Sequence, residues 1–130
     1  MAYALSVRLP MAFAPAVERV RAALLEQGFG VITQIDLQAT LREKIGVQIE
    51  EYLILGACNP ELAHRAVNID RDIGLLLPCN VVVRAGGPDA TLVQALDPQV
   101  MVQVSKRAEL GPVADEAARR LGTALDALAG

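Results

Sequence analysis

Two cysteine-asparagine steps, Cys58-Asn59 and Cys79-Asn80, are the residues of this sequence best suited to chemistry. A cysteine thiolate can act as a nucleophile, a redox centre or a metal ligand, and an asparagine amide both donates and accepts hydrogen bonds. Asn59 also precedes Pro60, a pairing typical of a helix start, where free backbone N–H groups favour an anion. We therefore take Cys58 and Cys79 as candidate nucleophiles and all four residues as candidate ligand-binding residues.

Three interpretations of the two steps stay open at the level of sequence. In the first, a small anionic or thiol-reactive ligand binds where Cys58 and Cys79 meet. In the second, the chain is a thiol-based redox protein or enzyme in which Cys58 attacks and Cys79 resolves. In the third, both cysteines are buried apolar side chains of a structural or interaction module, because free cysteine is among the most buried residue types.

A metal site is not expected, because the two cysteines and the single histidine, His64, give only three soft ligands per chain. Their spacing also differs from the C-x-x-C pattern of zinc sites. Asp36 and Lys44 are two further polar candidates, although helix capping and the helix dipole also explain them. The sequence identifies no cofactor and leaves open whether any reaction is catalysed.

The elements that position these residues are indicated by the period of the apolar side chains. We expect five strands and four helices: strands over 3–9, 29–35, 47–55, 79–84 and 91–96, and helices over 13–27, 37–45, 60–69 and from 111 onward. Cys58 would then lie just past the third strand and Cys79 at the start of the fourth. If these strands are antiparallel neighbours, both thiols lie at one edge of the sheet. Residues 98–105 fit a strand or a helix equally well.

This order of elements predicts a single domain over residues 1–130 of the α+β class, with one mainly antiparallel sheet and helices packed on one face. A doubly wound parallel sheet is the alternative, and the hairpin expected at Gly86-Gly87 disfavours it. Apolar residues fall on both faces of some strands, such as Val81 and Val83 against Val82. We therefore expect a homodimer that covers part of the second face.

Composition limits the classes of partner. The 130 residues are 53% hydrophobic and 3% aromatic, with a net charge of −3 and scattered basic residues. We expect no nucleic-acid partner, because no basic stripe is present to neutralise phosphates. We also expect no membrane partner, because every apolar run is far shorter than a bilayer requires. The start of the chain lacks the pattern of a signal peptide, so we expect a cytoplasmic protein with free thiols.

The sequence also resembles a known family, the domain of unknown function 302 family, over nearly its whole length. The resemblance is carried by these segments: Gly28-Phe29-Gly30-Val31, Ile35-Asp36, Lys44, Tyr52, Leu55-Gly56-Ala57-Cys58-Asn59-Pro60 and Gly74-Leu75-Leu76-Leu77-Pro78-Cys79-Asn80-Val81. It implies an α+β fold similar to that of the TATA-binding-protein-like class, commonly in a dimer, with no established activity. A shared fold implies no DNA binding.

The resemblance adds candidates to the ligand-binding set without giving them roles. The full set is Asp36, Lys44, Tyr52, Cys58, Asn59, Cys79 and Asn80. One departure is Gln34, where the family often has an acidic residue before the Ile-Asp step. If that acid were a catalytic partner, this chain would lack it.

Overall fold

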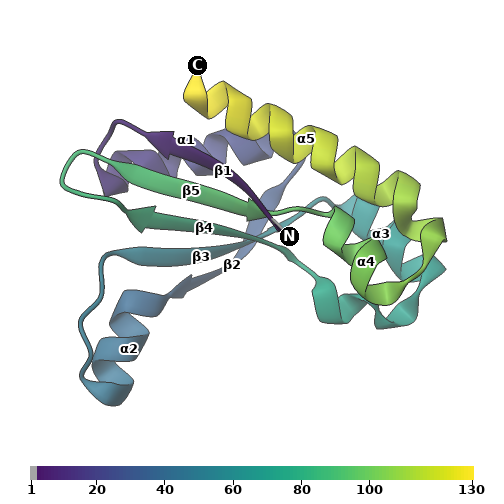
Figure 1. The fold of residues 1–130 in the computed structure, drawn as a ribbon, viewed down its shortest axis with the longest axis horizontal. Coiled ribbons are helices and arrows are strands. Elements are labelled where there is room, and N and C mark those ends of the chain that lie inside the picture. Colours follow the sequence, from purple (N-terminus) through teal and green to yellow (C-terminus); the bar gives the residue numbers. More distant parts are fainter. Residues whose placement is uncertain (1–2) are drawn as a thin grey trace.

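The computed structural model describes residues 3–130, which form a five-stranded antiparallel sheet with helices. The strand order across the sheet is β1-β5-β4-β3-β2, and every neighbouring pair is antiparallel. The strands are β1 (Ala4–Leu9), β2 (Gly30–Asp36), β3 (Tyr52–Cys58), β4 (Cys79–Ala85) and β5 (Thr91–Leu96), drawn in Figure 1. The predicted α+β class and antiparallel sheet are therefore confirmed.

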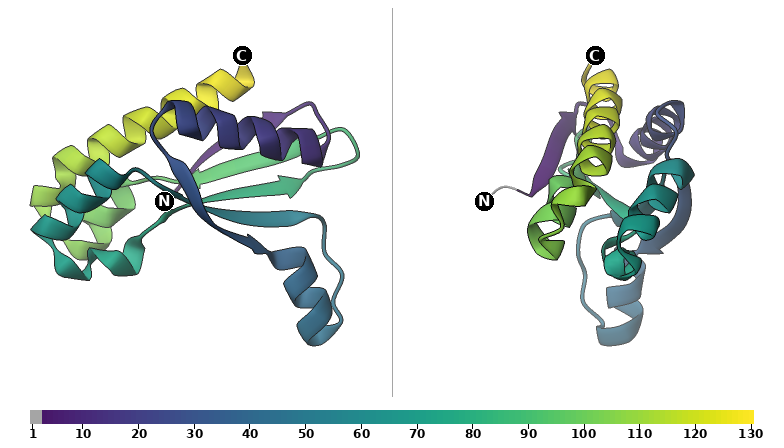
Figure 2. Two further views of the ribbon diagram at one scale, coloured as in Figure 1. Left: turned by 180° about the vertical axis from the view of Figure 1, so that it is seen from behind. Right: turned by 90° about the vertical axis from the view of Figure 1, so that its right-hand side faces the viewer.

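Two long helices pack on one face of the sheet, as Figure 2 shows: α1 (Phe13–Glu26) and α5 (Gly111–Ala129). The shorter helices lie at the two ends of the sheet. At one end, α2 (Leu37–Ile45) projects as an arm. At the other, α3 (Pro60–Ile69), η1 (Arg71–Leu76), α4 (Gln99–Ser105) and η2 (Ala108–Leu110) form a lobe. Within residues 3–130, no helix has both the length and the apolar character needed to cross a membrane.

The hydrophobic core lies between the sheet and the two long helices. Alternate residues of the central strands point into it, as a period of two requires, among them Leu55 of β3, Val81 of β4 and Val93 of β5, all fully buried. Their neighbours along each strand point to the other sheet face, which α1 and α5 leave uncovered. We call this the open face.

Several local signals act as the sequence predicts. Asp36 caps α2 by accepting a hydrogen bond from the backbone N–H of Ala39, at 2.9 Å. Gly46 ends the same helix in the left-handed conformation, with φ of 69°. The hairpin between β4 and β5 forms at Gly86-Gly87, and its antiparallel register is continuous.

Two expectations about element boundaries change. The third strand was expected over 47–55, but β3 begins at Tyr52 and extends to Cys58. The preceding segment instead returns along α2, where the Gln38 amide donates to the Ile49 carbonyl at 3.1 Å. The ambiguous segment 98–105 is helical, with Asp97 accepting a hydrogen bond from the Gln99 backbone N–H.

Candidate functional site

The two cysteines lie on adjacent strands at the same edge of the sheet. In the β3–β4 ladder, Cys79 is directly opposite Ala57, the residue before Cys58. Because successive strand residues point to opposite faces, the ladder directs Cys79 toward the helices with Ala57 and directs Cys58 toward the open face. The two cysteines therefore lie at one edge of the sheet, as the sequence predicts. Strand order alone did not predict that their side chains point to opposite faces.

A small cavity of about 30 Å³ lies beneath this edge. Both cysteines and Asn59 contribute to its wall, and the remaining lining side chains are apolar, among them Phe29, Leu62 and Met101. A water-sized group needs about 10–15 Å³ measured in this way, so the cavity has room for roughly two such groups. It suits a short apolar moiety.

Burial perturbs the chemistry of the Cys79 thiol. Burial, with a smaller effect from the neighbouring Cys58, raises the pKa of Cys79 from 9.0 to about 11. At neutral pH the thiolate fraction of Cys79 is therefore on the order of 10⁻⁴, so Cys79 is a poor nucleophile. Its protonated S–H group is a weak hydrogen-bond donor instead. Both cysteines are free in the structure.

Asn59 is the buried polar residue at the centre of the site, with 7% of its surface exposed. It is the N-cap of α3, and its Oδ1 accepts a hydrogen bond from the Leu62 backbone N–H at 3.1 Å. This bond fixes the orientation of the amide, because only the oxygen can accept. The Nδ2 group therefore points the other way, toward the end of α1.

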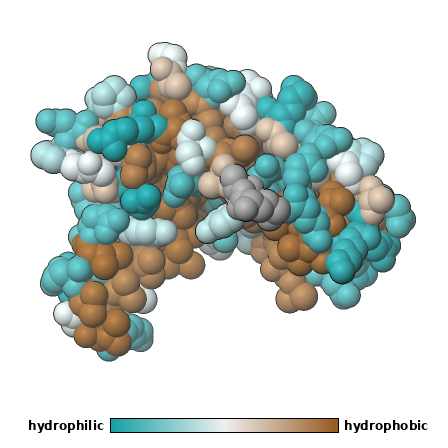
Figure 3. All heavy atoms as spheres, viewed as in Figure 1, coloured by the Kyte–Doolittle hydropathy of each residue, from teal (hydrophilic) through white to brown (hydrophobic). Residues whose placement is uncertain are grey.

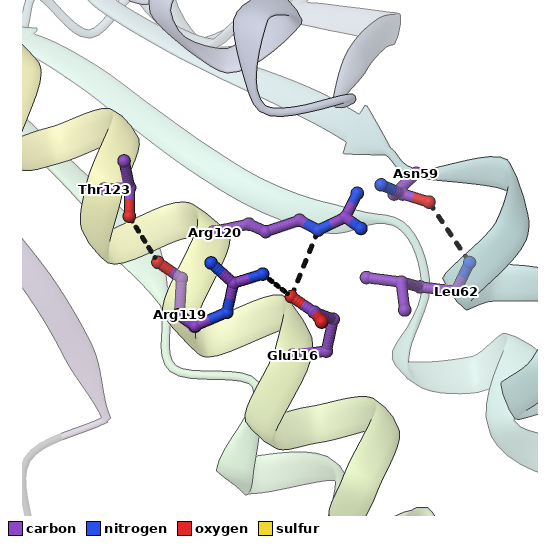
Figure 4. A network of polar contacts seen from close by, with 6 residues as sticks. All are labelled: Asn59, Leu62, Glu116, Arg119, Arg120 and Thr123. Carbon is purple, nitrogen blue, oxygen red and sulfur yellow. Dashed lines mark hydrogen bonds and ion pairs between the residues drawn. The ribbon is translucent and has the colours of Figure 1, made fainter.

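There it meets a second hydrogen-bond donor, Arg120 of α5. A methyl group placed on Gly28 would lie 2.9 Å from Asn59 Nδ2 and 3.3 Å from Arg120 Nη1, so both nitrogens border the same small space. We call these two nitrogens the donor pair. Figure 4 shows the Arg120 side chain reaching from α5 toward Asn59. Gly28 carries no side chain that would press against these two nitrogens, and its φ of +83° is one that L side chains rarely adopt.

The charge around the donor pair favours an anion. Glu116 is the carboxylate that contacts Arg120, with Oε2 3.2 Å from Arg120 Nε, but it also pairs with Arg119. The hydrogen bond from Arg119, with another from Arg120, lowers the pKa of Glu116. One carboxylate thus faces two guanidinium groups, which leaves one positive charge in this cluster. Two exposed carboxylates oppose this charge, Glu61 in the first turn of α3 and Glu26 at the end of α1.

Of the other four predicted site residues, Asn80 lies at this edge beside Cys79 but points to the open face, and the other three are not brought to the edge. Tyr52 and Asn80 line a hollow on the open face, Tyr52 being at the opposite end of β3 from Cys58. Asp36 and Lys44 belong to the start and the last turn of α2. Tyr52 and Cys58 stand six residue steps apart along β3, or roughly 20 Å. One ligand at the cysteines therefore does not also contact Asp36, Lys44 or Tyr52.

His64 lies on the exposed side of α3, where its Nε2 is 3.2 Å from the Asn68 amide nitrogen. Within residues 3–130, no group of three or more His, Cys, Asp or Glu side chains is arranged to hold a metal ion.

The sequence did not predict that Arg120 lies at this site or that Gly28 lies against Asn59 and Arg120. The position of Arg120 depends on how α5 crosses the start of α3, a contact between segments far apart in the chain. The helix expected over 13–27 ends just before Gly28, which agrees with its left-handed conformation but does not predict its contact with Asn59 and Arg120. The one available signal was the Arg119-Arg120 pair within a helix whose other face is apolar.

Taken together, these features define a small α+β domain with one helix-covered sheet face and a thiol- and amide-lined edge. The chain belongs to the family described as Domain of unknown function DUF302, whose model matches residues 5–128. Its structure is similar to the crystal structure of an uncharacterized conserved DUF302 protein from Bacillus stearothermophilus, with a TM-score of 0.88 and 28% sequence identity over 97% of this chain and 98% of that one. No curated protein matches the chain. The resemblance seen in the sequence is thereby confirmed.

Proposed function

We propose that this domain binds a small molecule that carries an anionic group and a short apolar part. The observation that supports it best is the donor pair: Asn59 Nδ2 and Arg120 Nη1 both lie on the side of Gly28 where a side chain would stand. Two donors that face the same side of Gly28 can share one acceptor, and the surplus positive charge of the Arg119–Arg120–Glu116 cluster favours an anion as that acceptor.

The apolar part of the ligand enters the cavity lined by the cysteines. Asn59 belongs to both places, because its side chain lines the cavity and its Nδ2 borders the anion space. On α5, Ala117 of the cavity wall and Arg120 are one turn apart. The cavity volume of about 30 Å³ limits this apolar part to roughly two carbon-sized groups. Short-chain carboxylates have this shape and charge.

In this proposal both cysteine residues border the cavity, and the Cys79 thiol, which points to the helix side of the sheet, is held protonated. A soft, polarisable contact is the chemistry such a thiol offers to a ligand. The proposal places the domain in a reducing compartment such as the cytoplasm, where both thiols stay free. Thiol redox catalysis is the weaker candidate, because a resolving cysteine must form a thiolate and Cys79 resists doing so.

A series of carboxylates tests the proposal. Formate, acetate, propionate, butyrate and hexanoate are titrated into ¹⁵N-labelled protein, and the side-chain amide signal of Asn59 and the backbone amide signal of Cys79 are followed. We expect affinity to rise with chain length and to stop rising once the cavity is full, with Cys79 responding only to the longer members. Sodium chloride at equal ionic strength is the control. No saturable shift at Asn59 with any member would refute the proposal.

A further inference from the structure

The open face of the sheet carries polar side chains that the proposed function does not use. Figure 3 shows hydrophilic residues among hydrophobic ones over the strands. The strand register arranges the side chains of this face in rows that run across the sheet. One row contains Arg8, Leu92, Arg84 and Tyr52, and the next row contains Ser6, Gln94, Val82 and Ile54.

Two arginine side chains form a basic end of the open face. Arg8 of β1 and Arg84 of β4 each stand directly opposite Leu92 of β5, so a single strand separates them. Arg8 reaches across that strand, because a methyl group placed on Gly86 would lie 3.4 Å from Arg8 Nη1. Gly86 follows β4 directly. Both guanidinium groups therefore lie near the same end of β4.

Little negative charge opposes these two arginines. Arg84 Nη1 lies 3.8 Å from Glu50 Oε2, and the Glu50 side chain is 43% exposed. Within residues 3–130, no carboxylate forms an ion pair with Arg8. Asp89 of the hairpin is exposed, and solvent and salt screen a charge in such a place. The basic end therefore has positive charge to offer to an anion.

Two hollows meet on the open face. The smaller hollow, of about 210 Å³, has both arginines of the basic end in its wall. The larger hollow measures about 500 Å³. Ser6 and Gln94 line both hollows, and the Gln94 amide donates a hydrogen bond to the Ser6 hydroxyl at 3.2 Å. Because the two hollows share these residues, one molecule can occupy both.

The larger hollow suits a flat heteroaromatic ring. Its wall contains both tyrosines of the chain, Tyr3 and Tyr52, and aromatic side chains pack well against other flat rings. Asn80 and Gln94 also line it, and their amides offer the donors and acceptors that the edge of a heterocycle needs. Its volume lies within the range of about 300–1,000 Å³ that is typical of small-molecule sites.

We infer that the open face binds a small molecule in which a heteroaromatic ring is joined to a phosphate group, as in a mononucleotide. The phosphate lies at the basic end between Arg8 and Arg84, since a guanidinium group matches phosphate oxygens in pairs. The ring lies in the larger hollow. Tyr52 and Asn80, two of the ligand-binding candidates, then belong to this site and not to the cysteine edge. The donor pair is on the helix side of the sheet, so this inference is independent of the proposed function.

Titration of protein labelled with ¹³C at its tyrosine rings tests the inference. The chain has two tyrosines and no tryptophan, so every labelled ring borders the larger hollow. AMP, GMP, CMP and UMP are compared with adenosine and with inorganic phosphate at equal ionic strength. We expect a saturable shift of the Tyr3 and Tyr52 signals with at least one mononucleotide. Adenosine and phosphate should bind at least about tenfold more weakly, because each lacks one of the two contacts.

Three variants locate the phosphate. Arg8→Gln and Arg84→Gln each remove one guanidinium group and should weaken mononucleotide binding about tenfold or more. Arg19→Gln is the matched control, because Arg19 is an exposed arginine of α1, on the other side of the sheet. It should bind as the wild type does. The tyrosine signals report on the open face and the Asn59 signal reports on the donor pair, so the failure of either proposal is detected separately.

Three results would overturn the inference. The first is the absence of a saturable shift at both tyrosines with all four mononucleotides. The second is adenosine or inorganic phosphate that binds as tightly as the mononucleotides, because ring and phosphate would then not act together. The third is mononucleotide affinity that neither Arg8→Gln nor Arg84→Gln lowers relative to Arg19→Gln, while all three variants keep the wild-type circular dichroism spectrum.

Discussion

Asn59 and Arg120, one at the start of α3 and the other in the middle of α5, direct two nitrogen donors at the same space beside Gly28. The cap bond to Leu62 fixes the direction of the Asn59 amide, and Glu116 holds the Arg120 side chain through its Nε. The helix cap therefore has two roles in this account. Its oxygen stabilises α3, and its nitrogen faces the proposed anion.

These two roles can be separated by substitution of Asn59. Asn59→Asp keeps an oxygen for the Leu62 backbone N–H but removes the Nδ2 donor, so stability should be unchanged or higher while anion binding is lost. Asn59→Ala removes both and should lower the free energy of unfolding by about 1 kcal/mol. Urea unfolding and carboxylate titration of the same samples check this. Carboxylate binding by Asn59→Asp that equals the wild type would contradict the role given to Nδ2.

The close approach of three strands at the cysteine edge makes Gly56 sensitive to substitution. A Cβ on Gly56 would lie 2.1 Å from Thr33 Oγ1 and 2.9 Å from Pro78 Cγ. Gly56→Ala should therefore destabilise the fold by about 2 kcal/mol, and adding Thr33→Ala should recover part of the loss. Gly30→Ala is the control, since no atom lies within 4 Å of its Cβ position. Equal denaturant midpoints for Gly56→Ala and Gly30→Ala would show that this packing is wrong.

The raised pKa of Cys79 makes stability depend on alkaline pH. Below pH 9 the thiol is protonated in both the folded and the unfolded chain, so it has no effect on the pH dependence. Between pH 9 and pH 11 only the unfolded chain loses the proton, and stability falls as the pH rises. By pH 10.5 the wild type should lose about 2 kcal/mol more than Cys79→Ala does. Parallel curves for the two proteins, measured by urea unfolding from pH 8 upward, would count against a buried Cys79 thiol.

The arrangement of the two thiols should prevent an internal disulfide. Cross-strand geometry puts the Cα atoms of Cys58 and Cys79 about 6 Å apart, which a disulfide can span, but the strand pleat directs the two side chains to opposite faces. Mild peroxide should therefore give no Cys58–Cys79 crosslink in the folded protein, whereas the chain in urea should form one. Peptide mass spectrometry after alkylation measures both. Rapid, complete crosslinking of the folded form would favour the redox interpretation instead.

Much of this site could be read from the sequence because its signals are local. An Asx residue before a helix start identified the caps Asp36 and Asn59, and a glycine after the last helical turn identified the end of α2. The position of Cys79 at the start of a strand followed from Pro78, which cannot donate into the middle of a ladder. Each of these inferences needs only a few neighbouring residues.

The features that could not be predicted from the sequence depend on contacts between segments far apart in the chain. The start of β3 at Tyr52 depends on how residues 47–51 pack along α2, since Val47 and Ile49 carry the apolar alternation of a strand. The helix over 99–105 forms although three valines alternate there, because an Asp97-Pro98 start outweighs β-propensity in a segment that packs against α5. The donor pair joins α5 to the start of α3, a pairing that no local spacing encodes.

Anion binding by the donor pair is measured most directly by the shift of the Asn59 side-chain amide signal during titration with acetate. Four variants are compared with the wild type: Arg120→Gln, Gly28→Ala, Gly46→Ala and Arg42→Gln. Arg120→Gln removes the charge, and Gly28→Ala fills the anion space with a methyl group. Gly46→Ala imposes a similar left-handed strain, at φ of +69°, with nothing within 4 Å. Arg42→Gln removes an exposed charge on the distant arm.

We expect a saturable shift in the wild type, Gly46→Ala and Arg42→Gln, with affinity at least about tenfold weaker in Arg120→Gln and Gly28→Ala. A shift that is absent from the wild type, or that is the same in Arg120→Gln as in Arg42→Gln, would contradict this expectation.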